Sequence, residues 1–437
     1  MNMKAKIIGY GVSGKAAESY LEAHGVETVV VADANEKVAG DYDFCVVSPG
    51  VPKEQIKNES VPVIPEVELP FYCEPKLKAR CLIAVTGTNG KTTIVNQIYR
   101  LCTLAKTKAV LCGNVGVPVS RVAGQLSGAV AVVEVSSFML ENTSILHPQI
   151  AVLTNITSDH LDRHLTMEEY MRCKAQIVAQ QTKRDCLIVN WDDLNSRMVG
   201  LMIERKKTTR VIWYSAREVV TGYYVRDGKI WEHLGRHAKC LGLVETLGGM
   251  DHTLSNALAV VAVGRRLKIS TAVIWDACTY QAQPHRMELV GDVDGIAFYN
   301  DSKATNMAAT LAAVHAIKIP TCLILCGLSK GQDYYELLTQ LPDQVKQVLV
   351  FGSIREQVMQ TAQALGLSHV RSVLNLTDAV KQAVQLVTRP GVILFSPSGS
   401  SFDEFVNYEH RGDEFRKIVK TITGRAPQYS HPTDADL

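Results

Sequence analysis

The sequence predicts an α/β protein whose domains are each built on a mainly parallel sheet. Three observations support this fold class. Short apolar runs alternate with helical stretches along most of the chain, glycine-rich turns follow two of these runs, and polar loops follow several later ones. At 437 residues the chain is also too long for a single hydrophobic core, which favours two or three domains.

The composition is that of a soluble enzyme and disfavours several classes of protein. Hydrophobic residues make up 46% of the chain and charged residues 21%, which is enough apolar material for sizeable cores. The chain has 46 Lys and Arg and 44 Asp and Glu, so its charges almost balance. The net charge therefore indicates neither nucleic acid nor a membrane as the main partner. The eleven scattered cysteines include no C-x-x-C pair, and no apolar run approaches the ~20 residues of a membrane span. We therefore expect a reduced, cytoplasmic protein without a cysteine zinc site.

A glycine-rich turn opens the chain. A predicted strand at 6–8 leads into G-x-G-x-x-G at Gly9, Gly11 and Gly14, and a helix and a strand at 28–31 follow. Three glycines at this spacing allow a tight turn, close approach of a diphosphate and close helix packing. The pattern alone fits a dinucleotide as well as a nucleotide diphosphate, so it leaves a nicotinamide-dependent oxidoreductase open. A further strand is expected at 44–47.

The strongest motif is Thr-Gly-Thr-Asn-Gly-Lys-Thr-Thr at 86–93, between an apolar run and a helical pattern. Such a loop directs backbone N–H groups at an anion, Lys91 reaches the outer phosphates, and the Thr92 hydroxyl can bind Mg²⁺. Val85 stands where the full G-x-x-x-x-G-K-[ST] pattern has its first glycine. A simple tight turn would not explain Gly-Lys-Thr after a buried strand, so the motif predicts ATP binding. The predicted ATP-binding residues of the loop are Gly87, Thr88, Asn89, Gly90, Lys91, Thr92 and Thr93.

Two further apolar runs end in residues that suit a metal or phosphate site. The run at 129–135 is apolar except for Glu134, as in a parallel strand buried on both faces. Glu134 at its end either faces a ligand crevice or is solvated in the following loop. The run at 150–155 is followed by several Asp and His residues at 157–164, which are common ligands of metal ions.

The next helix is predicted to begin at Thr166. Thr166 as N-cap with Glu169 three residues later forms the pattern of a capping box. Lys174 lies on or beside the apolar stripe of this helix, so it either extends along the core to solvent or is chemically modified or catalytic. The stripe consists of Tyr170, Cys173, Ile177 and Val178.

A last group of strands alternates with helical stretches and ends in polar loops. Such loops, at 301–306, 329–331 and 396–403, form the usual ligand crevice of an α/β sheet. The strands are expected at 296–300, 321–325, 348–351 and 392–395. Proline-bearing segments near 62–75 and at Pro284 separate this region and the first from the middle of the chain. The expected domains are a Rossmann-like domain at 1–66, a central P-loop ATPase domain at 67–282 and a second Rossmann-like domain at 283–437.

With these motifs in order, the chain resembles the Mur ligase family, and the match runs through all three expected domains. The motifs that carry the resemblance are the loop at 86–93, Gly113–Gly116, Glu134–Phe138, Asn155–Arg163, His285–Arg286, Asn300–Asn306 and the segment from Ser396 to Gly412. The chain departs from residues usual in the family at Met139, Thr253, Leu328, Ser329 and Gly399.

The resemblance implies an ATP-dependent ligase that joins D-glutamate to UDP-N-acetylmuramoyl-L-alanine in peptidoglycan precursor synthesis, as a cytoplasmic monomer. ATP would activate the substrate carboxylate as an acyl phosphate, and Mg²⁺ with Lys91 would offset the repulsion between the two anions. A related ligase with another amino-acid substrate is the alternative. An oxidoreductase would have no use for the Gly-Lys-Thr loop, and retention of Glu134, His160 and Lys174 together argues against a non-catalytic nucleotide-binding protein.

The resemblance also implies roles for individual residues. The catalytic residues would be Lys91, His160 and Lys174. One Mg²⁺ would be held by Thr92 and Glu134, and a second by His160 and a carbamylated Lys174. The remaining contacts to ATP would come from Asn256, Arg286 and Asp301. The UDP-substrate would contact Gly11, Ser13, Asn35, Asn114 and Ser136. The residues around D-glutamate would be Lys303, Thr305, Lys330, Ser401 and Phe402.

Overall fold

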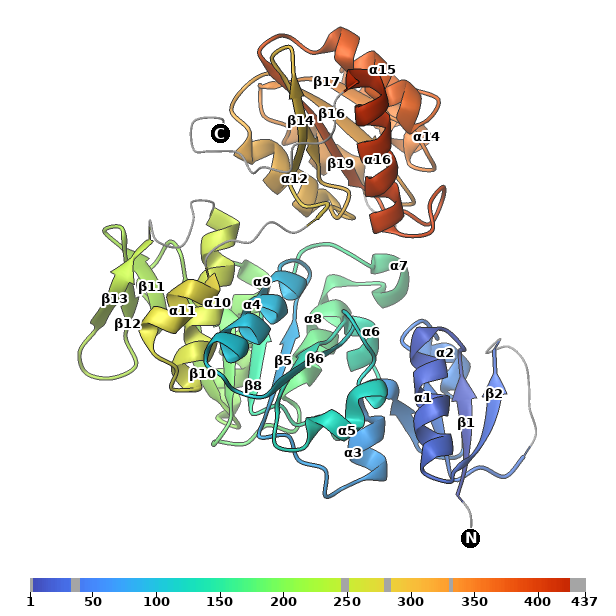
Figure 1. Cartoon of the computed structure of the whole chain (residues 1–437), viewed down its shortest axis with the longest axis vertical. Helices are drawn as coiled ribbons and strands as arrows, with labels where there is room; N and C mark the ends of the chain where they lie inside the picture. Colours follow the sequence, from blue (N-terminus) through green and yellow to red (C-terminus); the bar gives the residue numbers. More distant parts are fainter. Residues whose placement is uncertain (1–2, 33–39, 245–250, 279–283, 330–332, 425–437) are drawn as a thin grey trace. The chain divides into compact units, whose positions relative to one another are not determined.

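The computed structural model describes residues 3–32, 40–244, 251–278, 284–329 and 333–424. The chain forms two compact units: Met1–Thr157 with Arg163–Tyr280, and Ser158–Asp162 with Gln281–Leu437. Both are built from sheets covered by helices, which confirms the predicted α/β class (Figure 1). Among the helices in the described ranges, none is both long and apolar enough to cross a membrane.

The first unit begins with a four-stranded parallel sheet in the order β2-β1-β3-β4. Its strands are β1 (Lys4–Ile8), β2 (Glu27–Val31), β3 (Phe44–Val47) and β4 (Val63–Pro65). The helix α1 (Val12–Ala23) packs on one face through Ala17 and Leu21, and Ile56 of α2 (Lys53–Ile56) packs on the other. Because β1 lies between β2 and β3, the crevice of this sheet opens where β1 runs into the predicted glycine turn.

The rest of the first unit is built on a nine-stranded sheet in the order β13-β12-β11-β10-β9-β8-β5-β7-β6. In this order the seven strands from β6 to β11 are parallel, whereas β12 pairs antiparallel with both β11 and β13. The strands near the middle of the order are β5 (Cys81–Thr86), β6 (Ala109–Gly113), β7 (Val130–Glu134) and β8 (Ile150–Leu153). The others are β9 (Cys186–Asn190), β10 (Arg210–Ser215), β11 (Gly222–Arg226), β12 (Lys229–Glu232) and β13 (Lys239–Leu243).

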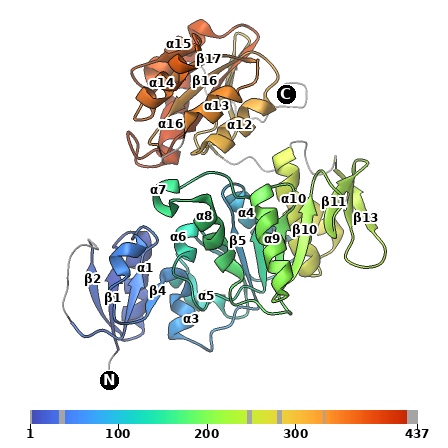
Figure 2. The ribbon, with the colours of Figure 1, turned by 180° about the vertical axis from the view of Figure 1, so that it is seen from behind.

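Helices cover both faces of this sheet because its strands are apolar on both. In β5, Leu82 and Ala84 belong to one core, while Ile83 and Val85 belong to the other. One face carries α4 (Lys91–Leu104), α10 (Asp251–Arg266) and α11 (Thr271–Cys278) (Figure 1). The opposite face carries α5 (Ala123–Leu126), α6 (Ser137–Leu140), α8 (Met167–Ala175) and α9 (Leu194–Lys206) (Figure 2). Of these strands, β5, β7 and β8 were predicted from the sequence, whereas β6 and the strands from β9 to β13 were not.

A short segment joins the two sheets of the first unit. It comprises the 3₁₀ turn η1 (Glu66–Glu68) and α3 (Leu69–Cys73). Glu66 Oε1 accepts from the Ser120 N–H at 2.7 Å, and Glu68 Oε1 accepts from three successive N–H groups at 144–146. The proline-bearing segment is therefore anchored by two buried carboxylates.

The second unit contains a six-stranded sheet in the order β14-β15-β19-β16-β17-β18, parallel except for the β14–β15 pair. Its strands are β14 (Glu288–Val293), β15 (Ile296–Asn300), β16 (Thr321–Cys326), β17 (Val345–Val350), β18 (Val370–Ser372) and β19 (Gly391–Ser398). One face packs on α12 (Met307–Ala316), α13 (Tyr334–Thr339) and α14 (Arg355–Ala364), and the other on α15 (Leu376–Leu386) and α16 (Tyr408–Thr423). The four strands predicted here are present, and β14 and β18 add to them.

Candidate active site

The phosphate-loop motif forms a tight connection from β5 to α4. Gly87 and Gly90 have φ of 147° and 84°, in the region that favours glycine. A Cβ on Gly87 would lie 1.9 Å from Thr154 Oγ1, and one on Gly90 would lie 2.5 Å from Asn256 Oδ1. No side chain of the described residues caps the N-terminus of α4, so its first N–H groups can bind an anion.

The end of β8 holds this loop in shape. The Asn89 N–H donates to Asn155 Oδ1 at 2.9 Å, and Asn155 Nδ2 donates back to the Asn89 carbonyl at 3.1 Å. Thr88 Oγ1 lies 3.2 Å from the buried Tyr170 hydroxyl, and Thr93 is buried on α4. The predicted ATP-binding residues of the loop are thus positioned by two neighbouring strands and by α8.

Two lysine side chains converge on this loop. Lys91 Nζ donates to the carbonyl oxygens of Gly87 and Thr88 at 2.9 and 2.8 Å. Lys174 Nζ donates to the same Gly87 oxygen at 2.9 Å and lies 4.4 Å from the centre of the Tyr170 ring. Lys174 is only 1% exposed, so the interpretation in which its amine reaches solvent is wrong. In their cationic forms the two amines concentrate positive charge at one turn of backbone.

The helix that carries Lys174 begins as predicted but lacks half of the capping box. Thr166 Oγ1 accepts from the Glu169 N–H at 3.1 Å, which confirms the N-cap. The Thr166 N–H, however, donates to the His164 carbonyl at 2.7 Å, and the Glu169 carboxylate lies 4.0 Å from Arg172. The local turn at 164–166 therefore satisfies the donor that the capping box would assign to Glu169.

Glu134 is buried at the end of β7, with 1% exposure. Its Oε2 accepts from Thr92 Oγ1 and its Oε1 from Asn114 Nδ2, both at 2.9 Å. The alternative in which Glu134 is solvated in a loop is therefore wrong. The adjoining hydroxyl and carboxylate oxygens beside the loop are of the hard type that Mg²⁺ prefers. In the described parts of the chain, His, Cys, Asp and Glu do not gather in threes that could hold a metal by themselves.

The N-terminal glycine turn has the geometry of a diphosphate cradle. Gly9 has φ of 84°, and a Cβ on Gly14 would lie 2.2 Å from the Gly9 carbonyl oxygen. A Cβ on Gly11 would meet nothing within 4 Å, so this side of the turn is open. Ser13 is half-buried in the first turn of α1. Asn35 lies outside the described residues, and Ser136 accepts from the Met139 N–H as N-cap of α6.

Arg163 links this first sheet to the second, and sequence analysis assigned it no role. Its guanidinium donates to the carbonyl oxygens of Gly50 and Val51 at 3.2 and 2.7 Å. It also forms two hydrogen bonds with the Glu141 carboxylate, at 3.0 and 2.6 Å, and lies over the Phe138 ring. The turn after β3, which borders the glycine cradle, is thereby tied to the helix that follows β7.

In the second unit, a buried carboxylate lies at the end of β15. Asp301 Oδ2 accepts from Ser396 Oγ at 2.8 Å and its Oδ1 from the Met287 N–H at 3.2 Å. Burial raises the pKa of Asp301 to about 6, although Ser396 and the nearby Arg286 charge oppose the rise. Arg286 Nε is buried without a hydrogen-bond partner in the described structure. This cationic donor therefore has capacity for a ligand.

The residues predicted to surround the amino acid differ widely in exposure. Ser401 is buried, Thr305 is half-buried, and Lys303 Nζ lies 5.6 Å from the centre of the Tyr408 ring. Phe402 is 73% exposed, and Lys330 lies outside the described residues.

Arg411 lies in the last motif of the family resemblance, was given no role there, and contacts the loops after β15 and β19. It is fully buried and donates to the carbonyl oxygens of Ser302 and Gly399 at 2.8 and 3.0 Å. Burial lowers the pKa of Arg411, so its three backbone and hydroxyl contacts matter for keeping the charged form in place.

The expected site residues thus form separate clusters in the two units. The first unit holds Lys91, Thr92, Glu134, Lys174, Asn114, Asn256 and the N-terminal cradle. The second holds Arg286, Asp301, Lys303 and His160, whose Nε2 lies 3.6 Å from Asp159 Oδ2. Asp159 in turn accepts from Asn306 Nδ2 at 3.3 Å within this unit.

A glycine loop at a strand end, with an uncapped helix N-terminus and a threonine that donates to a buried glutamate, is typical of proteins that bind nucleotide phosphates. Comparison with known families is more specific. The family model described as Mur ligase middle domain matches residues 85–264, and that described as Mur ligase, glutamate ligase domain, matches residues 285–399. The chain belongs to the Mur ligase family.

Individual relatives agree with this assignment. A UDP-N-acetylmuramoylalanine--D-glutamate ligase of Alkaliphilus oremlandii is 34% identical, over 89% of this chain and 86% of the relative. One of Acidobacterium capsulatum is 35% identical over 98% of both chains. The fold resembles the MurF ligase from Thermotoga maritima solved in complex with ADP, with a TM-score of 0.58, 15% identity and 96% of each chain covered.

Proposed function

We propose that this chain is an ATP-dependent ligase that adds D-glutamate to UDP-N-acetylmuramoyl-L-alanine through an acyl phosphate, in peptidoglycan precursor synthesis. The observation that carries the ATP dependence is the hydrogen bond from Thr92 to the buried Glu134, beside a glycine loop with an uncapped helix N-terminus. The substrate assignment is supported by relatives of that name, which are 34–35% identical over most of both chains. A related ligase with a different amino-acid substrate remains the second candidate.

The three sheets support a division of labour among three domains. The four-stranded sheet with its glycine cradle would bind the UDP-substrate within residues 1–66, with Gly11, Ser13 and Asn35 as contacts. The nine-stranded sheet would bind ATP within residues 67–282, and the six-stranded sheet the amino acid within residues 283–437. Asn114 directly follows β6, and Ser136 lies just after β7. These two residues would contact the muramoyl group.

The chemistry requires two anions to meet, the substrate carboxylate and the γ-phosphate. Lys91 would neutralise the outer phosphates of ATP, whose oxygens would displace its contacts with the Gly87 and Thr88 carbonyls. Thr92 and Glu134 would hold Mg²⁺, which supplies further charge neutralisation when bound. The D-glutamate amine would then attack the acyl phosphate and release inorganic phosphate. Asn256, Arg286 and Asp301 would bind the remaining parts of ATP, with Arg286 using its buried Nε.

Lys174 would serve a second Mg²⁺ together with His160 after carbamylation. Lys174 Nζ is buried and donates to the Gly87 carbonyl, which also accepts from Lys91, so carbamylation would place an anion beside the Lys91 cation. A neutral amine is the form that reacts with carbon dioxide, and the carbamate that results is an anion with oxygen ligands suited to Mg²⁺. Around D-glutamate we place Lys303, Thr305, Lys330, Ser401 and Phe402.

A phosphate-release assay tests this function. We expect release from ATP only with Mg²⁺, UDP-N-acetylmuramoyl-L-alanine and D-glutamate together, and little with other L- or D-amino acids. Preference for another amino acid would favour the second candidate. Without any amino acid, hydroxylamine should trap the acyl phosphate as a hydroxamate, and absence of the hydroxamate would contradict the proposed intermediate. Light scattering of the same preparation should show a monomer.

A further inference from the structure

The backbone around Arg286 is strained in the second unit. His285 and Met287, which flank it, have φ of 61° and 43°, a region that residues with side chains seldom adopt. Such a conformation persists only where its surroundings hold it, and it is found most often at functional sites. Contacts of residues 285–288 must therefore stabilise the strained backbone on either side of Arg286.

Hydrogen bonds to neighbouring residues hold three backbone groups beside Arg286. The His285 N–H donates to Glu288 Oε2 at 2.9 Å, and the His285 carbonyl accepts from the Lys303 N–H at 3.0 Å. The Met287 N–H donates to Asp301 Oδ1 at 3.2 Å. The turn is thus connected directly to two residues that we place around ATP and the amino acid.

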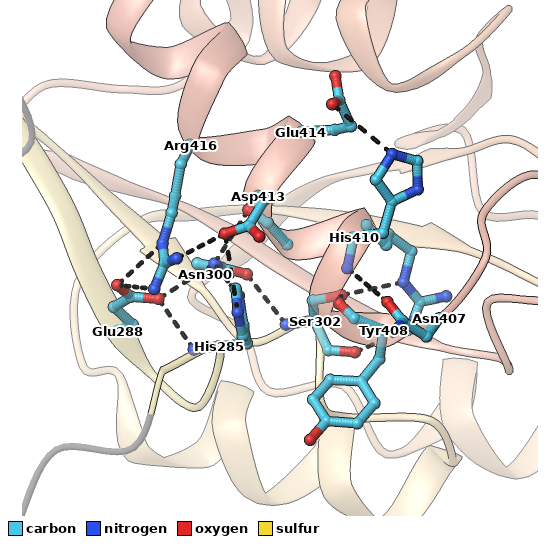
Figure 3. A network of polar contacts seen from close by, with 12 residues as sticks. His285, Glu288, Asn300, Ser302, Asn407, Tyr408, His410, Asp413, Glu414 and Arg416 are labelled. Carbon is cyan, nitrogen blue, oxygen red and sulfur yellow. Dashed lines mark hydrogen bonds and ion pairs between the residues drawn. The ribbon is translucent and has the colours of Figure 1, made fainter. Parts of the chain in front are cut away.

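Glu288 belongs to a network of polar contacts that connects this turn to α16 (Figure 3). Its Oε1 accepts from Arg416 Nη2 and Nε at 2.6 and 3.1 Å, and its Oε2 accepts from Asn300 Nδ2 at 3.2 Å. Arg416 Nη1 also donates to Asp413 Oδ1 at 2.6 Å. The side chains of Glu288 and Arg416 are 9% and 19% exposed, so solvent screens this pair less than a surface ion pair.

The packing of α16 against the turn leaves little freedom. A Cβ on Gly412 would lie 2.1 Å from His285 Nδ1, so the imidazole occupies the space that a side chain on this helix would fill. Asn300 Nδ2 lies 3.0 Å from His285 Nδ1 and donates to the Gly412 carbonyl at 3.3 Å. By contrast, Arg286 Nε has no hydrogen-bond partner among the described residues. The contacts therefore fix the backbone around Arg286, while the Nε of its guanidinium can still donate to a ligand.

We propose that Glu288 and Arg416 are positioning residues for ATP: they hold the strained turn that presents Arg286, so the affinity for nucleotide depends on an ion pair anchored in α16. This inference rests on the proposed role of Arg286 in ATP binding. Neither residue needs to touch ATP. Because a small misplacement of a binding group can cost a large factor in rate or affinity, loosening the turn should act on ATP selectively.

The test compares Arg416→Met and Glu288→Gln with Lys417→Met in the full-length protein. Lys417 pairs with Glu414 on the exposed side of α16, so its variant removes an ion pair of the same helix without touching the turn. We expect the first two to raise the KM for ATP by about tenfold and to leave the KM for the UDP-substrate unchanged. Lys417→Met should match wild type. Arg416→Lys should fall between, since one ammonium cannot reproduce the contacts of the guanidinium.

An Arg286→Met variant tests the role of Arg286 in ATP binding separately from the positioning role of Glu288 and Arg416. If it keeps wild-type affinity for ATP, the proposed role of Arg286 is wrong. If it loses affinity while Arg416→Met and Glu288→Gln keep theirs, the positioning inference alone is overturned. An equal loss in every KM and in thermal stability would also overturn it, since that is what a merely structural pair would produce. Should Arg416→Met fail to fold, Arg416→Lys decides: an unchanged KM for ATP refutes the proposal.

Discussion

Replacing Asp301 by Asn should stabilise the second unit at neutral pH while it weakens ATP binding. The carboxylate is buried beneath the end of β15, and its hydrogen bonds are suited to an amide as well. Asn Oδ1 can accept from the Met287 N–H, and its Nδ2 can donate to Ser396 Oγ. The Ser396 hydroxyl can then donate to Thr310 Oγ1, which lies 3.1 Å away. The substitution therefore removes a buried charge and keeps both of these hydrogen bonds.

The magnitude follows from the pKa of Asp301. Burial raises this pKa from 3.8 to about 6, so the folded state holds the proton more tightly than the unfolded state does. The stability that the bound proton of Asp301 contributes is therefore fully present below pH 3.8 and is lost as the pH rises through about 6. A pKa raised by about two units lowers the free energy of unfolding by ~3 kcal/mol at pH 7.5 and by less than ~1 kcal/mol at pH 4. Asp301→Asn should gain about this amount at pH 7.5 and little at pH 4.

Hydrogen exchange of amides in β15 and β19, followed by mass spectrometry at both pH values, would measure the stability difference between the two proteins within the second unit. The four tryptophans, at 191, 213, 231 and 275, all belong to the first unit. Urea unfolding followed by tryptophan fluorescence therefore serves as the control and should be the same in both proteins. A variant that is less stable than wild type at pH 7.5, or a difference that does not change with pH, would refute the reasoning.

The other predictions concern the first unit. Lys91→Ala should lower the rate of phosphate release by roughly a hundredfold or more, because it removes the cation at the phosphate loop; a loss of less than about tenfold would contradict this role. Lys174→Ala and Lys174→Arg should fold, as judged by circular dichroism, but both should lose most activity, since neither can form the carbamate; an active Arg variant would disprove carbamylation. Arg163→Met should raise the KM for the UDP-substrate and spare that for ATP, because Arg163 fixes the Gly50–Val51 turn beside the glycine cradle. Arg172→Met, which removes an exposed ion pair with Glu169, is its control, and equal effects of the two variants would rule out a specific role for Arg163.

Several features of the site were predictable because their causes are local. Gly87 and Gly90 adopt positive φ, and Gly14 packs against the Gly9 carbonyl, as motifs of this spacing require. The apolar run around Glu134 indicated a strand buried on both faces, and the buried carboxylate at its end follows from that pattern. The N-cap at Thr166 likewise depends on residues within one turn of helix.

Other features escaped prediction because their signals were weak or shared. The strands β12 and β13 lie at an edge of the nine-stranded sheet and contain lysines and a glutamate, so they lack the continuous apolar run that marked β5 and β7. The predicted hydrogen bond from the Thr166 N–H to the Glu169 carboxylate does not form, because this N–H donates to the His164 carbonyl. Sequence patterns indicate which groups can form a hydrogen bond, but the competing partners are set by the fold.

By itself, the sequence determined the α/β class, the order of the motifs and the family, since these depend on local backbone requirements and on the periodicity of apolar residues. Only the tertiary structure decided where the long charged side chains end. Lys174 reaches a carbonyl 87 residues away, and Arg416 pairs with a glutamate at a separation of 128 residues. Such side chains have several rotatable bonds and can either extend into solvent or pair within the protein. The packing of distant elements makes that choice, so it cannot be inferred from neighbours in the chain.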